Sequence, residues 1–416
     1  MTETGFLSVK QQKQCIRRMK HMNYTKSVAY VFSGLLSVSL IGCGGSSSSG
    51  GTLTGGSDDT KEVAVVAAVG SDFSSSSISV VEDTAAPDIV NGLVPTDQSD
   101  ITVATHGDYF YRIGRYGQDN ITKYSFSDPG KAEWQFSVNQ GEQTGANPYD
   151  LIFVNEQKAY VLRYGAGEIW IVNPSVAAND EANFKTGEID LSVYDSTDNV
   201  PEMSNAVLHD GKLYVSLQGL QPGFIPGQAW LVVIDTATDQ EVVTGRGGSL
   251  PGIPLTIKNP VDLDYNNGNL YITGIGRYAS RWSGTPAEYT GGIERIELAD
   301  FSSELVLDDG DDDNHPYGQI NGMEMVSESM LVFRGYASFG DETLYSLDLS
   351  NGQVSDLAFA GIADQDVRSI TLDSSGRLWV GLGGDAPLIQ VLTNSGELVS
   401  ELTLTQIPSR IVFGSK

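Results

Sequence analysis

From about residue 62 to the end of the chain, apolar and polar residues alternate in short segments, and helical spacing is almost absent. The segments come in pairs, in which one strand ends at a polar turn and a second strand follows with an aromatic residue near its start. The clearest pairs cover 206–215, 261–272 and 369–380. Their turns contain Asp-Gly, Asn-Gly or Ser-Gly, which favour hairpins because these residues tolerate positive φ.

The hairpin recurs with a period near 50 residues. Equivalent second-strand positions are 48 to 60 residues apart and fall at Phe110, Tyr160, Tyr214, Tyr271, Leu331 and Trp379. A third strand follows each pair, and weaker fourth strands are predicted at 132–138, 303–307 and 397–404. About four strands in each unit of this length are typical of a β-propeller, in which every blade is a four-stranded sheet.

The two ends of this pattern complete each other. Residues 409–413 have the pattern of a first strand without a hairpin partner, whereas 62–70 and 77–81 have that of second and third strands without a first strand. One blade shared between the termini would close the ring and remove its open sheet edges. The sequence therefore predicts an all-β domain over 61–416, a seven-bladed β-propeller whose last blade is closed by both termini.

The segment before this domain has a different composition. Basic residues precede an apolar run over about 28–42, which ends in Leu40-Ile41-Gly42-Cys43 and is followed by a Gly/Ser-rich tract. This order resembles the lipobox of bacterial lipoproteins. The resemblance implies a signal peptide over 1–42, a lipid on Cys43, and a flexible tether over 43–60. The alternative is an uncleaved membrane anchor, although the run is short for a span of about 20 residues.

The same resemblance predicts where the protein resides. We expect a lipid-anchored protein of the cell envelope at the outer membrane, since Gly44 replaces the Asp that favours inner-membrane retention; its periplasmic or surface side stays open. Translation starts at Met1 or at Met22, since both precede a basic segment. Cys15 leaves with the signal peptide and Cys43 is lipidated, so no disulfide is expected within the mature chain.

The mature chain is strongly acidic. The leader holds six Lys/Arg and one acidic residue, which leaves 25 − 6 = 19 basic and 53 − 1 = 52 acidic residues, a formal net charge of 19 − 52 = −33. Nucleic acid and anionic lipid surfaces would repel such a chain and are excluded as general partners.

Two segments within the repeats point to a family. Val232 to Asp239, with the sequence VVIDTATD, resembles the strand-and-turn phrase of YVTN-type, YncE-like propellers, and 344–352 is a weaker copy. The resemblance implies a fold and leaves function open. A lipobox joined to a propeller also resembles surface lipoproteins that deliver ligands to outer-membrane transporters, which implies a small ligand or an envelope protein as partner.

Strand order places the loops after the second strands on the same face as the links between blades, here called the top face. These loops and links are rich in Arg and aromatic residues, which suit an exposed pocket for a small anionic or aromatic ligand. The predicted ligand-binding residues are Arg115, Tyr116, Arg163, Tyr164, Arg277, Tyr278, Arg281, Trp282, Arg334, Tyr336, Arg368 and Arg410. The alternative is that each Arg pairs with an acidic residue of the next blade.

Two sets of oxygen ligands suggest calcium. Asp309, Asp311 and Asp313 have the alternate spacing with which a calcium loop begins, but Ile320 stands where the closing Glu belongs, so a solvated acidic loop is the alternative. The second set resembles the calcium site of lactonase- and phosphotriesterase-type propellers and consists of Asn205, Asn259, Asp262, Asn321 and Glu324.

Three functions follow from the sequence. The favoured one is a lipid-anchored binding propeller without catalytic residues, because the chain has no haem motif, no metal-spaced His pair and no Gly-x-Ser-x-Gly elbow. The alternatives are a calcium-dependent hydrolase that uses the axial oxygens, and an assembly scaffold.

Overall fold

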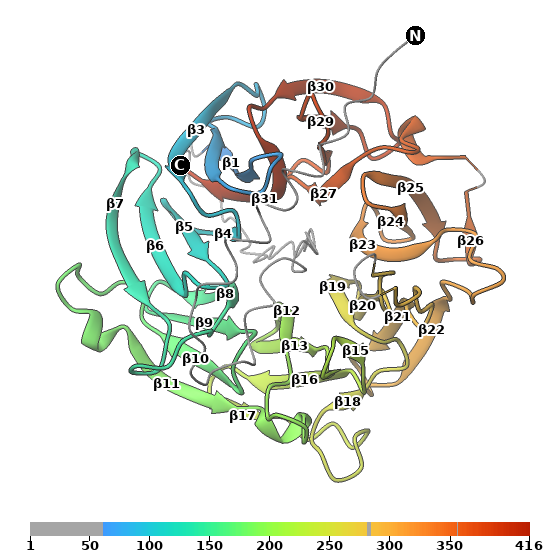
Figure 1. The fold of residues 1–416 in the computed structure, drawn as a ribbon, viewed down its shortest axis with the longest axis horizontal. Helices are drawn as coiled ribbons and strands as arrows, with labels where there is room; N and C mark the ends of the chain where they lie inside the picture. Colours follow the sequence, from blue (N-terminus) through green and yellow to red (C-terminus); the bar gives the residue numbers. More distant parts are fainter. Residues whose placement is uncertain (1–60, 281–283, 356) are drawn as a thin grey trace, which may run out of the picture. The chain divides into compact units, whose positions relative to one another are not determined.

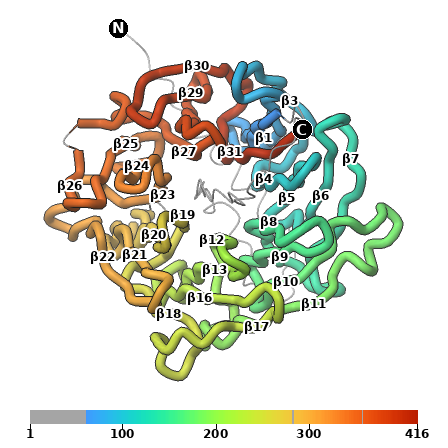
Figure 2. Tube along the Cα trace, turned by 180° about the vertical axis from the view of Figure 1, so that it is seen from behind, coloured from blue at the N-terminus to red at the C-terminus, as the bar shows by residue number. Residues whose placement is uncertain are grey.

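The computed structural model describes residues 61–280, 284–355 and 357–416. These residues form seven antiparallel sheets, six with four strands and one with five, arranged as the blades of a ring (Figures 1 and 2). The predicted seven-bladed propeller is therefore confirmed. Cys43, Arg281 and Trp282 lie outside the described residues, in which no helix is long and apolar enough to cross a membrane.

Each of the first six blades takes its strands in sequence order from the axis outward. Blade 1 consists of β4 (Ile101–His106), β5 (Tyr109–Gly114), β6 (Asn120–Ser125) and β7 (Asp128–Ser137). Blade 2 consists of β8 (Pro148–Asn155), β9 (Lys158–Arg163), β10 (Glu168–Val172) and β11 (Lys185–Asp190). Blade 3 consists of β12 (Met203–His209), β13 (Lys212–Leu217), β16 (Trp230–Asp235) and β17 (Gln240–Glu241), with β18 (Ile253–Pro254) also paired to β16. Blade 4 consists of β19 (Pro260–Asn266), β20 (Asn269–Gly274), β21 (Gly292–Glu297) and β22 (Ser303–Leu307). Blade 5 consists of β23 (Gln319–Met325), β24 (Met330–Ser338), β25 (Asp341–Asp348) and β26 (Gln353–Val354). Blade 6 consists of β27 (Val367–Leu372), β28 (Leu378–Leu382), β29 (Leu388–Leu392) and β30 (Leu398–Thr403).

Blade 7 is shared between the termini. Its innermost strand is β31 (Ile407–Ser415), which pairs with β1 (Glu62–Val69), and β2 (Ser76–Val81) and β3 (Ile89–Thr96) follow outward. The Lys61 and Lys416 backbones exchange two hydrogen bonds of 2.9 and 2.8 Å at the end of the closure. The predicted shared blade is confirmed. Its outermost strand, β3, was not predicted from the sequence.

The core lies between the blades. Each of the seven blade interfaces holds one hydrophobic cluster, so no blade has a core of its own. Two of the expected repeat positions are off by one residue. Phe110 and Leu331 face the preceding blade, whereas Tyr111 and Val332 face the following blade as Tyr160 does.

Candidate functional site

The arginines expected around the top face are paired with carboxylates. Every one that the structure describes has such a partner: Arg115–Asp100 at 3.4 Å, Arg163–Glu168 at 3.1 Å, Arg277–Glu288 at 3.4 Å, Arg334–Glu342 at 3.7 Å, Arg368–Asp366 at 2.5 Å and Arg410–Asp150 at 2.9 Å. All but Arg277 are buried. The expectation of an exposed ring of guanidinium groups is therefore wrong. The structure instead shows the alternative, in which each Arg pairs with a carboxylate. However, five of the six carboxylates belong to the same blade as their Arg, and not to the next blade.

One of these pairs joins two blades across the blade between them. Arg410 lies on the innermost strand of blade 7 and Asp150 on that of blade 2, with β4 of blade 1 between them. Both side chains are about nine-tenths buried. This ion pair ties together two blades that are not neighbours, at the start of their first strands.

Arg334 is buried because glycine makes room for it. Its side chain is 1% exposed, and its Nη2 donates to the Asn321 carbonyl at 2.8 Å. A Cβ on Gly322 would lie 3.0 Å from the Arg334 Nε. The guanidinium from the second strand thus occupies space that a side chain on the first strand would fill, and Glu342 compensates its charge.

An Arg-aromatic chain runs through the top loops of blades 1 to 4. The Arg115 guanidinium stacks 3.7 Å above the Tyr149 ring, which stacks on Tyr164 at 4.1 Å. The Tyr164 hydroxyl donates to Gln218, whose amide donates to the Pro260 carbonyl, at 2.7 and 2.9 Å. Burial raises the pKa of Tyr164 well above its ordinary value. Arg115 and Tyr164 therefore hold neighbouring blades together.

The other two tyrosines of the predicted set lie against each other. Tyr278 and Tyr336 are both half-buried, with ring centroids 4.5 Å apart, and they join the top loops of blades 4 and 5. Burial raises the pKa of Tyr278. This pair is thus also an interblade contact.

Three aromatic side chains of the top loops remain exposed. Tyr116 is 40% exposed, Phe224 54% and Phe339 50%, and within the described residues they are the exposed members of the large aromatic class. Each follows a second strand, on blades 1, 3 and 5 respectively. Phe224 lies on a small hairpin made of β14 (Leu220–Gln221) and β15 (Ile225–Pro226). We call these three residues the aromatic tips; sequence reasoning placed only Tyr116 in the site.

Several of the axial polar residues bind groups on their own or the next blade. Asp262 accepts from the Met323 backbone N–H at 2.9 Å, and Asp264 accepts from that of Met325 at 3.2 Å. Asn259 donates to the Gly276 carbonyl and Asn321 to Glu342. Asn205 and Glu324 are buried on β12 and β23. In the described part of the chain, no three His, Cys, Asp or Glu side chains are grouped so that they could hold a metal ion.

Asp262 is completely buried, and burial raises its pKa from 3.8 to about 8. A raised folded-state pKa stabilises the protein below the unfolded value, and this stabilisation is lost as the pH rises through the folded value. The unfolding free energy of the parent protein should therefore fall as the pH rises from 5 to 9. We expect this fall to be smaller by about 2–3 kcal/mol in Asp262→Asn, which has no carboxyl group to titrate at this position. Urea unfolding at both pH values measures this, with exposed Asp210→Asn as control. An unchanged drop would contradict the assignment.

The acidic run of blade 4 is divided between interior and solvent. Asp309 is fully buried and accepts from the Gly291 backbone N–H at 3.1 Å, and burial raises its pKa to about 7. Asp311 and Asp313 are exposed, and Asp311 accepts from the Asp313 and Asn314 backbone N–H groups. The three carboxylates thus point to different surroundings and do not form the beginning of a calcium loop.

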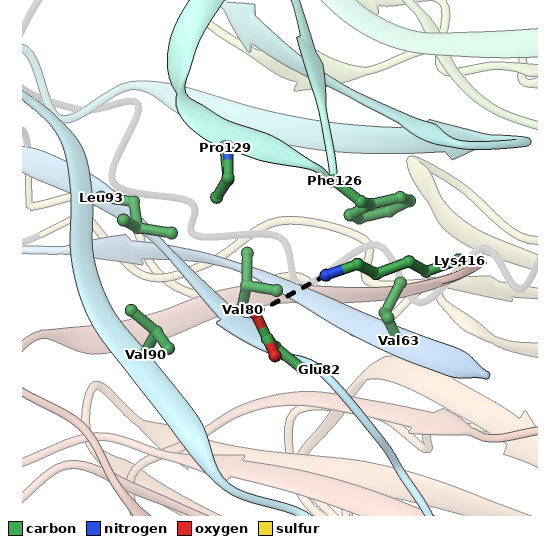
Figure 3. Close-up of a pocket in the computed structure, with 8 residues that line it drawn as sticks. All are labelled: Val63, Val80, Glu82, Val90, Leu93, Phe126, Pro129 and Lys416. Atoms are coloured by element: carbon green, nitrogen blue, oxygen red, sulfur yellow. Dashed lines mark ion pairs between the residues drawn. The ribbon is translucent and has the colours of Figure 1, made fainter.

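An apolar pocket described in the structure lies on the opposite face of the ring. It is located between blades 7 and 1, where β1 and the C-terminal Lys416 lie (Figure 3). The Lys416 ammonium group pairs with Glu82 at 3.7 Å beside it. Its lining residues are Val63, Val80, Glu82, Val90, Leu93, Phe126, Pro129 and Lys416. None of the predicted ligand-binding residues lines it.

No known family profile and no curated protein sequence matches the chain. Among solved structures, it is similar to a putative 6-phosphogluconolactonase from Bacteroides fragilis, with 12% identity over 86% of this chain and 99% of that chain and a TM-score of 0.56. A second putative 6-phosphogluconolactonase, from Bacteroides uniformis, has 10% identity over 85% and 99% of the two chains and a TM-score of 0.53. At these identities, the likeness shows that the chain shares the β-propeller fold of these proteins.

Proposed function

We propose that this chain is a binding propeller of the cell envelope, which docks a partner protein through the aromatic tips of its top face. The observation that carries the proposal is that Tyr116, Phe224 and Phe339 are all exposed on one face, whereas the other aromatic side chains that the structure describes are buried or half-buried. Exposed aromatic residues are enriched where proteins bind one another, because they bury much area at a small entropic cost.

A partner protein suits this face better than a small ligand does. The aromatic tips belong to blades 1, 3 and 5, which are not adjacent, so they present a wide surface. The guanidinium groups that would attract a small anion already have carboxylate partners. This arrangement favours the envelope-protein half of the sequence-based hypothesis over the small anionic ligand.

The calcium-dependent hydrolase has less support. Of its candidate ligands, Asp262 already accepts from the Leu263 and Met323 backbone N–H groups. Among the residues that the structure describes, no three His, Cys, Asp or Glu side chains are grouped so that they could hold a metal ion. The two neighbours described as putative lactonases share the fold at 12% and 10% identity, which carries no argument about their activity here.

A lipid on Cys43 would tether the propeller to the membrane, with the outer membrane as the proposed location. The proposal rests on the Leu40-Ile41-Gly42-Cys43 sequence and the Gly/Ser-rich tract behind it. Metabolic labelling with a palmitate analogue tests the anchor, since Cys43→Ser should remove the label. Equal labelling of both proteins would contradict it.

The docking proposal is tested by removing all three aromatic tips. Cells express either the parent chain, the variant with Tyr116→Ser, Phe224→Ser and Phe339→Ser, or a control, and are treated with formaldehyde before purification. The control replaces exposed apolar residues outside the top loops, namely Val243→Ser, Leu398→Ser and Val399→Ser.

Loss of an interface aromatic typically costs about 1–2 kcal/mol or more, so three substitutions should reduce the recovery of the partner at least about tenfold. The control should recover it as the parent does. A partner recovered equally with both triple variants would contradict docking through the aromatic tips.

A further inference from the structure

Two top-face loops meet across blade 6. Phe73, in the loop between β1 and β2 of blade 7, lies edge-on to Phe339 of blade 5 with ring centroids 6.2 Å apart. Blade 6 itself has only a short, glycine-containing turn between β28 and β29. Half of the Phe339 surface stays exposed above this contact. This contact brings the top-face loops of blades 5 and 7 together above blade 6.

Four acidic residues lie in the β1–β2 loop, in the link between β26 and β27, and in the β28–β29 turn. Asp72, Asp364 and Asp385 are exposed. Asp72 directly precedes Phe73, Asp364 is two residues before Asp366, and Asp385 is two residues after Gly383, which lies beside the Asp366 carboxylate. Asp366 is less exposed and contacts Arg368. We call Phe73, Phe339 and these four carboxylates the aromatic-acidic patch. Its neighbouring cation, Arg368, is 5% exposed and already paired, so the patch presents negative charge beside aromatic surface.

The protein itself shows how such a surface holds a cation. The Arg368 guanidinium carbon lies 4.5 Å from the Phe339 ring centroid, and its Nη2 is 2.5 Å from Asp366. Arg115 has the same arrangement between Tyr149 and Asp100. A cation held between an aromatic face and a carboxylate gains from both the ring quadrupole and the opposite charge.

We infer that the partner docks on the aromatic-acidic patch with a basic polypeptide segment, whose Lys or Arg side chains contact Phe339 and Phe73 and pair with Asp72, Asp364 and Asp385. This inference rests on the proposed function and adds the chemistry of the docked segment. Charge complementarity carries it, because an acidic segment would meet carboxylates whose repulsion the aromatic contacts would have to overcome.

The test uses the purified mature-length chain and two fluorescent peptides of about ten residues. One peptide alternates Arg and Trp, and the other alternates Glu and Trp, so both offer the same apolar surface. We expect the Arg peptide to bind at least about 100-fold more tightly in fluorescence anisotropy, and to weaken between about 0.05 and 0.5 M salt as screening increases. Equal affinities for the two peptides would overturn the inference.

A charge-matched pair of variants separates this patch from the general acidity of the chain. The first variant carries Asp72→Asn, Asp364→Asn and Asp385→Asn; the control carries Asp308→Asn, Asp312→Asn and Asp313→Asn in the exposed acidic run of blade 4. The first should weaken binding of the Arg peptide about tenfold or more, and the control less than about twofold. Equal losses in both would show attraction by bulk charge and overturn the inference.

The two proposals fail in different ways. If removal of the aromatic tips abolishes recovery of the partner while the Asn variants bind the Arg peptide like the parent, the docking face stands and the basic segment is wrong. If the partner is recovered without the aromatic tips, the proposed function itself fails. Phe339→Ser links the two tests, since it should weaken Arg-peptide binding without lowering the melting temperature by more than a few degrees.

Discussion

A chain that lacks Arg410–Lys416 is expected to lose cooperative unfolding altogether. These residues form most of β31, which pairs with β1 from Glu62 to Val69 and supplies the innermost strand of blade 7. Ile411 packs with Val66 in the cluster between blades 6 and 7, and Arg410 neutralises Asp150. The deletion opens two blade interfaces, whose loss exceeds the total stability of about 5–15 kcal/mol that domains possess.

Thermal unfolding followed by circular dichroism measures this effect. The parent should melt in one sharp transition, and the truncated chain should show none or aggregate. Deletion of Lys416 alone is the control and should change the melting temperature by only a few degrees. A truncated protein that melts at the temperature of the parent would contradict closure of the ring by β31.

Replacing Arg334 with alanine is expected to destabilise the fold by about 3–5 kcal/mol, because it leaves the buried carboxylate of Glu342 without a counter-charge. Burial already raises the pKa of Glu342, so the unpaired carboxylate should take up a proton in the variant. Arg277→Ala removes a more exposed pair with Glu288 and should cost less than about 1 kcal/mol. Urea unfolding of both variants tests the contrast, and similar losses would contradict the assignment of Arg334 and Glu342 as a buried ion pair that stabilises the fold.

The fold could be predicted because its signals are local and repeated. Alternation and hairpin turns located the inner strands, and the unmatched strands at the two ends located the shared blade. The strand β3 was missed because Gly92 and Pro95 interrupt its alternation, and its pairing with β2 contains two register shifts. The aromatic repeat was misaligned at Phe110 and Leu331 because each stands beside another large apolar residue, and only packing decides which of them faces the next blade.

Whether a predicted site residue is buried or exposed depends on its tertiary contacts, both within its blade and with the next blade. The Arg-Tyr pair occurs both at 115–116 and at 163–164, yet Tyr164 stacks on Tyr149 while Tyr116 is 40% exposed. Nothing in the dipeptide distinguishes the two. A signal for ion pairing was present, however, since a Glu lies just before or within the first two residues of the third strand after Arg163, Arg277 and Arg334. In a hairpin, such residues lie across the loop from each other and can pair.

The resulting top face has two layers. Arg115, Arg334 and Arg368 lie beneath the surface and stabilise the blades, and the aromatic tips stand above them. Substitution in the lower layer should therefore lower stability, and substitution in the upper layer should lower binding. The Arg-rich sequence pattern thus located residues that are buried in ion pairs beneath the aromatic tips.

The most direct test of docking through the aromatic tips is site-specific photocrosslinking in living cells. A photoreactive phenylalanine analogue at position 339 is compared with the same analogue at position 398, which is exposed on the outermost strand of blade 6. Our account predicts a covalent adduct of one defined mass from position 339 and none from position 398. Equal adduct yields from the two positions, or an adduct from position 398 alone, would contradict it.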